Sequence, residues 1–102
     1  MTRAEPDAIV EVRFLTTAEG GRMKPVLGTD FRTVFEIDGE NHSGCFIAPD
    51  PLVMELGCTY EVPVFFLYPE HVLPKLAVGK AFTVWEGRTI ASGKIVRVLR
   101  RS

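Results

Sequence analysis

The sequence has few of the residues on which small catalytic and metal-binding sites depend. Only two cysteines and two histidines occur among its 102 residues. Cys45 and Cys58 do not form a Cys-x-x-Cys pair and are too few for a disulfide framework, so we interpret both as small buried hydrophobic residues. His42 and His71 follow no metal-site or catalytic-triad pattern, and we expect both to be exposed loop residues.

Glycine patterns that bind phosphate are also lacking. The chain has no Gly-x-x-x-x-Gly-Lys-Ser/Thr loop and no Gly-x-Gly-x-x-Gly after a strand. Asp38, Glu40 and Asp50 do not have the spacing of a calcium loop, and we interpret them as residues of solvated turns. Because no nucleophile, base and charge stabiliser form a recognisable set, the sequence predicts no enzyme, no cofactor and no metal.

Long apolar runs are absent as well. No stretch of about eighteen consecutive apolar residues is available to cross a membrane, and residues 1–7 lack the apolar core of a secretory signal. The composition is otherwise ordinary, with 46% apolar and 25% charged residues. We expect a soluble cytoplasmic protein with one domain at 8–99, a flexible tail at 1–7 and a basic tail at 100–102.

Short segments of alternating apolar residues, separated by Gly, Pro and Asp, dominate the chain. Six strands joined by short connections avoid open edges by closing on themselves. We therefore predict an all-β fold, a single six-stranded antiparallel β-barrel. Its strands are predicted over Ala8–Leu15, Phe31–Ile37, Cys45–Ala48, Tyr60–Tyr68, Ala81–Trp85 and Thr89–Leu99.

Several irregular features interrupt this pattern. Pro63 cannot donate a ladder hydrogen bond, which predicts a bulge or a locally unpaired edge, and a change of phase in the last strand predicts a bulge near Lys94–Arg97. The polar run Glu40–Gly44 is predicted to be a turn. Leu52–Gly57 is predicted to cover one end of the barrel, and Pro69–Lys80 to be a loop long enough for a role of its own.

The charges are unevenly distributed although the net charge is −1. Pro25–Pro74 has eight acidic residues and one basic residue, whereas Lys75–Ser102 has seven basic residues and one acidic residue. This polarity either steers a partner or is neutralised by pairing across strands. Phosphate contact and simple solubility are both open roles for the basic residues near the end, which are Arg88, Lys94, Arg97, Arg100 and Arg101.

Two motifs that contain glycine and arginine stand out. Glu19-Gly-Gly-Arg22, with Pro25, follows the first strand, and Phe82-Thr-Val-Trp-Glu-Gly-Arg-Thr-Ile-Ala-Ser-Gly-Lys-Ile95 lies near the end. In this order and separation they resemble the third, C-terminal barrel of elongation factor Tu and related translational GTPases. The resemblance covers about Ala8 to Leu99 and implies a six-stranded antiparallel barrel.

The resemblance also implies a role in binding. In that family the barrel packs on the GTPase domain, meets protein partners such as the nucleotide-exchange factor, and helps to hold the T-stem of aminoacyl-tRNA. The family's tRNA-contacting loops map here to Gly21, Arg22, Met23, Gly87, Arg88 and Thr89. With two residues of the basic last strand, Lys94 and Arg97, they form our predicted binding set.

The chain departs from the family in three places. It contains no GTPase domain, Gly28-Thr-Asp-Phe31 replaces a Gly-Tyr-Arg-Pro segment, and Glu86-Gly-Arg-Thr89 is a shortened form of Glu-Gly-Gly-Arg-Thr. The main hypothesis is therefore a free-standing protein-interaction barrel connected with translation. The alternative is an RNA-binding module that uses the basic strand and the Gly-Arg loops.

Further alternatives stay open at this point. A small-ligand barrel or enzyme is one, with Pro69–Lys80 as its lid. A homo-oligomer is another, since an unpaired edge at Pro63 can accept a strand from a second copy or from an extended peptide.

Overall fold

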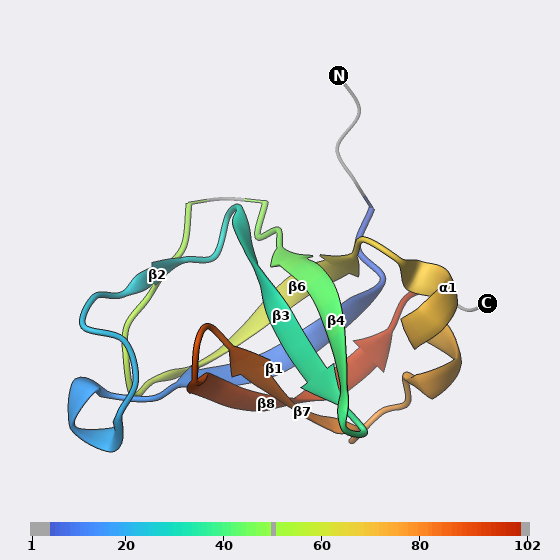
Figure 1. The fold of residues 1–102 in the computed structure, drawn as a ribbon. Helices are drawn as coiled ribbons and strands as arrows, with labels where there is room; N and C mark the ends of the chain where they lie inside the picture. The colour runs from blue at the N-terminus through green and yellow to red at the C-terminus, as the bar shows by residue number, and fades with distance from the viewer. Residues whose placement is uncertain (1–4, 50, 101–102) are drawn as a thin grey trace.

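The protein folds into a closed antiparallel barrel of six strands, which confirms the predicted fold class (Figure 1). The computed structural model describes residues 5–49 and 51–100. The order around the barrel is β1-β6-β4-β3-β7-β8. The strands are β1 (Ala8–Phe14), β3 (Phe31–Ile37), β4 (Glu40–Phe46), β6 (Thr59–Phe66), β7 (Ala81–Trp85) and β8 (Thr89–Val98).

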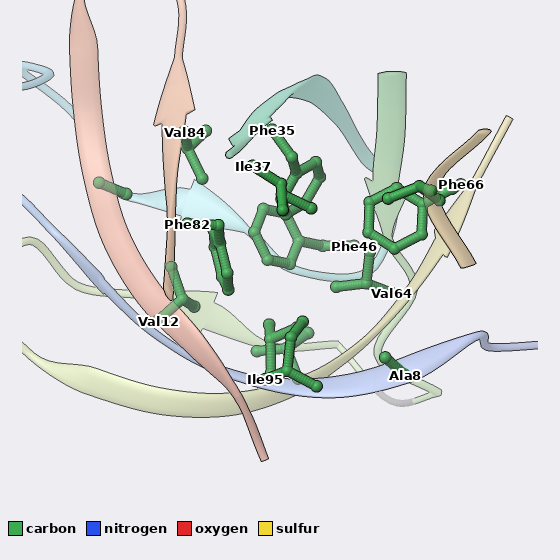
Figure 2. Close-up of a cluster of buried hydrophobic side chains, with 14 of the residues drawn as sticks. Ala8, Val12, Phe35, Ile37, Phe46, Val64, Phe66, Phe82, Val84 and Ile95 are labelled. Carbon is green, nitrogen blue, oxygen red and sulfur yellow. The ribbon is translucent and has the colours of Figure 1, made fainter. Parts of the chain in front are cut away.

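The barrel interior is filled with apolar side chains. In β1, Ala8, Val10, Val12 and Phe14 are fully buried, as the alternation in the sequence predicts. The ring of Phe35 lies at the centre, with its centroid 5.2 Å from that of Phe46 and 5.4 Å from those of Phe66 and Phe82 (Figure 2). Such ring clusters supply a large share of the burial that stabilises a small core.

The prediction of a turn at Glu40–Gly44 is wrong, because this polar run is the first part of β4. Ile37 pairs with Glu40, so the turn consists of Asp38 and Gly39 alone, with φ angles of 53° and 78°. Two consecutive positive φ angles are what a two-residue hairpin turn requires, and Asp-Gly adopts them readily. The turn therefore ends five residues earlier than the polar composition indicated.

The two predicted irregularities differ in outcome. A bulge is present in β8, since Val10 pairs with Ile95 while Ile9 pairs with Arg97. Pro63 pairs with Ile9 of β1 without a register shift, so no bulge forms there. Pro63 has no amide hydrogen to donate. The fold tolerates this because the ladder between β6 and β4, on the other side of β6, ends at the neighbouring Val64.

Two smaller elements close the ends of the barrel. A two-stranded ribbon, β2 (Val26–Leu27) with β5 (Val53–Met54), contributes Val26 and Met54 to the core. The segment predicted to be a long loop contains α1 (Pro69–Val72) and a 3-10 turn, η2 (Leu73–Lys75). Figure 1 shows α1 on the opposite side of the barrel from β2.

The predicted N-terminal tail does not extend as far as Asp7. The side chain of Asp7 is 1% exposed, its Oδ2 accepts a hydrogen bond from the Phe66 amide at 2.8 Å, and its Oδ1 lies 3.3 Å from Nη1 of Arg100. Its carbonyl accepts from the Leu99 amide at 2.9 Å. Asp7 thus joins both ends of the barrel chain, whereas residues 1–4 and 101–102 of the predicted tails lie outside the described residues.

The cysteines also differ from each other. Cys45 is buried as predicted, and burial, followed by a hydrogen bond to Asp30, raises the pKa of its thiol to about 11. Cys58 is exposed, so the prediction for it is wrong. Its position beside Gly57, in the turn before β6, holds it outside the core.

Among residues 5–49 and 51–100, no helix has the length and apolar character needed to cross a membrane.

Candidate functional site

The first glycine-arginine motif lies in a loop whose backbone is fixed by a capping box. The Glu19 amide donates to Oγ1 of Thr16 at 3.2 Å, and the Thr16 amide donates to Oε1 of Glu19 at 2.8 Å. Nη2 of Arg13 lies 3.1 Å from the same carboxylate oxygen. The Thr16 amide bond, and then the Arg13 bond, lower the pKa of Glu19. The loop is thus an ordered part of the fold.

Gly21 brings the two motifs together. It is buried, and a Cβ at this position would overlap the carbonyl oxygen of Leu15. Its own carbonyl accepts a hydrogen bond from Nη2 of Arg88 at 3.1 Å, across 67 residues of sequence. The structure therefore places the loop of Gly21 beside the β7–β8 hairpin.

Arg22 is held by three groups of the same protein. Its Nη1 lies 2.6 Å from Oε1 of Glu86, its Nε donates to the carbonyl of Lys24 at 3.4 Å, and its guanidinium carbon lies 5.3 Å from the ring centroid of Phe31. These contacts fix the side chain in one place and satisfy part of its donor set. Arg22 and Arg88 thus both serve to connect the two loops.

A shallow pocket of about 310 Å³ lies between these loops. Met23 stands at its rim with 83% of its surface exposed, the largest exposure among the large hydrophobic side chains in the described chain. We call this region the loop-end surface, defined by Arg22, Met23, Lys24, Glu86 and Arg88. It combines one apolar side chain with three basic groups and one acidic group.

More apolar side chains are exposed on the adjoining elements. Trp85, which precedes Glu86 in the chain, is 47% exposed. Leu27 and Val53, which face each other in the β2–β5 ribbon, are 61% and 49% exposed. Figure 1 shows the ribbon and the loop after β1 on the same side of the barrel. Isolated exposed hydrophobic residues are common, but a group beside a fixed loop is a feature of interaction sites.

The predicted binding set does not come together as a whole. Gly21, Arg22, Met23, Gly87 and Arg88 lie at this end, where Gly87 has a φ angle of 74° in the hairpin turn. The exposed Thr89 follows directly and pairs with Trp85 at the start of β8.

The two basic residues of the last strand lie elsewhere. Lys94 is in the middle of β8, with its Nζ 4.0 Å from Oε1 of Glu11. Arg97 pairs with Ile9 near the far end of the strand. Five residues of a strand span about 16 Å, so neither belongs to the loop-end surface.

Four basic residues of the C-terminal part are paired with acidic residues on other strands and loops. This favours the second of the two interpretations of the charge pattern, although exposed ion pairs contribute little free energy individually. The ion pairs between the basic C-terminal part and the rest of the chain include Lys75–Glu40, Lys80–Asp38, Lys94–Glu11 and Arg100–Asp7.

A larger hollow, of about 660 Å³, is an open groove lined mainly by residues of β1, β3, β7 and β8. Its charged groups are bonded to neighbours in the protein. Glu36 accepts from Oγ1 of Thr83 at 3.2 Å, and Asp38 lies 3.0 Å from Nζ of Lys80. The groove therefore presents few charged groups without a partner among the described residues.

A second cluster, which sequence reasoning missed, joins both histidines. A pocket of about 360 Å³ between β4 and α1 is lined by Glu40, Asn41, His42, Ser43, Tyr68 and His71. His71 is exposed as predicted, but the His42 side chain is only 9% exposed, which corrects the prediction for it. The Asp-Gly turn was the available signal, because a two-residue turn at 38–39 puts His42 on a strand. Among the described residues, no group of three side chains is placed to hold a metal ion.

No model of a known protein family matches this chain, and no curated protein matches its sequence.

Proposed function

We propose that this protein is a non-catalytic binding module, a barrel that recognises another protein through the loop-end surface. The observation that carries the proposal is Met23, an apolar side chain held 83% exposed on a backbone fixed by the capping box and by Arg88. A fixed loop loses little conformational entropy on binding. Ordering of the loop therefore offsets little of the free energy that Met23 contributes through its contacts with a partner.

The surroundings of Met23 indicate the chemistry of the partner. Arg22, Lys24 and Arg88 outnumber Glu86, which leaves a net positive rim around an apolar centre. A partner surface with an apolar recess bordered by carboxylates complements this arrangement. The exposed Trp85 next to the rim is a residue type that often contributes strongly to protein interfaces.

A protein partner accounts for these features better than RNA does. Arg22 and Arg88 are bonded to groups of the protein, and Lys94 and Arg97 lie away from them along β8. Binding to a nucleic-acid backbone relies on several cations that are free to replace counterions on one face. RNA binding is therefore the alternative outcome of the affinity-capture experiment.

As part of the same proposal, the barrel is related to the third barrel of elongation factor Tu. The protein then acts in the cytoplasm, in connection with translation. Two observations support this relationship. The barrel has six antiparallel strands, and the loops of the two motifs that carry the resemblance are joined by the Arg88–Gly21 hydrogen bond.

The proposal is tested by affinity capture with three versions of the tagged chain: wild type, Met23→Asp and Val78→Asp. Val78 is a matched control because it is 71% exposed and lies in the connection between η2 and β7. A captured protein should be recovered with the wild type and with Val78→Asp but lost with Met23→Asp. Titration with that purified protein should then show binding weakened at least about tenfold by Met23→Asp.

Two results would overturn this proposal. One is recovery of the same proteins with all three versions, because the contact would then not involve Met23. The other is recovery that disappears after nuclease treatment and weakens steeply with added salt, which is the behaviour of an RNA-binding module.

A further inference from the structure

The end of the barrel that carries α1 lies opposite the loop-end surface (Figure 1). Leu67–Lys80 closes this end by burying Val72, Leu73 and Leu76 in the core cluster. Its C-terminal part is tied to β8, because the Gly79 amide donates to the carbonyl of Ile95 at 2.7 Å. We call Leu67–Lys80 the plug segment.

His42 lies on β4, and its pocket is shared with Tyr68 and His71 of the plug segment. Its side chain is 9% exposed, and its Nε2 is fully buried without a hydrogen-bond partner in the described part of the chain. An unpartnered buried nitrogen is unusual in proteins, where such groups nearly always have a partner. The plug segment is thus packed over a polar atom that makes no hydrogen bond with the described residues.

The carboxylate at ion-pair distance from Nε2 of His42 is already engaged by a lysine. Glu40, on the same strand, has Oε1 3.8 Å from Nε2, beyond hydrogen-bond distance, and this carboxylate pairs with Lys75 of η2. From α1 the neighbouring titratable groups are His71 and, just before the helix, the phenol of Tyr68. Across the β3–β4 ladder His42 faces the apolar Phe35.

We propose that His42 is an acid-sensitive latch, which lets the plug segment close over the barrel only while its imidazole is uncharged. When the imidazole gains a proton, the closed arrangement buries a cation that makes no hydrogen bond to the Glu40 carboxylate, which lies 3.8 Å away and is shared with Lys75. Opening of the plug segment lets water reach the ring and exposes the apolar side chains of Val72, Leu73 and Leu76. The result is an apolar surface that forms in mild acid.

The direction of the pH dependence follows from the protonation equilibrium. Burial, and then the proximity of His71, lower the pKa of His42 from its usual value of 6.5. The opened segment has the ordinary pKa, so it takes up a proton before the closed segment does. The closed form is fully stable above pH 6.5 and loses stability as the pH falls from there towards the lower pKa of the closed form.

Hydrogen exchange followed by mass spectrometry tests the latch. Peptides from the plug segment contain the reporter amides of Leu73, Leu76 and Gly79, which are hydrogen-bonded in the closed form. After correction for the intrinsic pH dependence of exchange, their protection should fall by up to about tenfold between pH 7.5 and pH 5.5 in the wild type. Protection should be independent of pH in His42→Gln, whose side chain is polar but does not titrate.

His71→Gln is the matched control, because His71 lies in the same pocket but is exposed, and this variant should keep most of the pH response. Equal protection at both pH values in the wild type, or an undiminished response in His42→Gln, would overturn the proposal. If the variant does not fold, NMR titration of the His42 imidazole in the wild type tests the latch. The latch requires the midpoint of His42 to lie below 6.5, and a midpoint at or above 6.5 excludes it.

Discussion

The two ends of the barrel are closed in opposite ways. At the loop end, hydrogen bonds and an ion pair fix two loops to each other, and an apolar side chain, Met23, is left outside. At the plug end, apolar side chains such as Leu76 fill the barrel, and a polar ring, His42, is left inside with no hydrogen bond to its Nε2 from the described residues. A rigid exposed group is suited to binding, whereas a buried unpartnered group is suited to switching.

The largest expected effect on stability is at the plug end. Leu76→Ala removes a buried side chain from the core cluster and should lower the free energy of unfolding by about 2–5 kcal/mol. Urea denaturation measures the change. A loss below about 1 kcal/mol would mean that the plug segment packs loosely. The plug end would then not be closed by packed apolar side chains, and it would no longer differ from the loop end in this respect.

The next effect probes the rigidity of the loop end. Gly21→Ala puts a Cβ where the carbonyl oxygen of Leu15 lies, so the loop must shift, at an expected cost of about 1–3 kcal/mol. Gly87→Ala is the companion variant, with open space around it but a φ angle of 74°, and should cost about 1 kcal/mol. If Gly21→Ala is the milder of the two in thermal denaturation, the loop is not fixed as described.

A smaller effect is expected from the contact between the loops. Arg88→Gln loses the hydrogen bond to the Gly21 carbonyl and should lower the free energy of unfolding by about 0.5–1.5 kcal/mol. Arg97→Gln, on the exposed face of β8, should change it by less than about 0.5 kcal/mol. Equal losses in the two variants, measured side by side in urea, would show that Arg88 does not connect the loops.

The smallest effect on stability should accompany the largest effect on binding. Met23→Asp alters a side chain that is 83% exposed, so the free energy of unfolding should change by less than about 0.5 kcal/mol. Binding of the partner should nevertheless weaken at least about tenfold. A variant that binds poorly because it is partly unfolded would show a lowered melting temperature, which separates the two causes.

The sequence predicted the barrel because alternation is a local signal that each strand carries by itself. The bulge in β8 was predictable for the same reason, since the change of phase at Ile95 is visible in the chain. Gly21 and Arg88 were predicted to share a site from paired motifs, and the fold brings them into contact. These features depend on short patterns that the rest of the chain does not override.

Other features depend on contacts that no local pattern contains. The polar composition of Glu40–Gly44 indicated a turn, but the Asp-Gly hairpin and pairing with β3 make it a strand. His42 is buried because the plug segment, about thirty residues later in the chain, folds over it. Lys94 and Arg97 were grouped with the loops by charge, whereas the length of β8 separates them.

The most direct test of the binding proposal is site-specific photo-crosslinking. A photoreactive amino acid is introduced at position 23 in one version of the chain and at position 78 in another, and both are irradiated in living cells. The proposal predicts one dominant protein adduct from position 23 and none of the same mass from position 78. Adducts of equal yield from both positions, or an adduct with RNA at position 23, would contradict it.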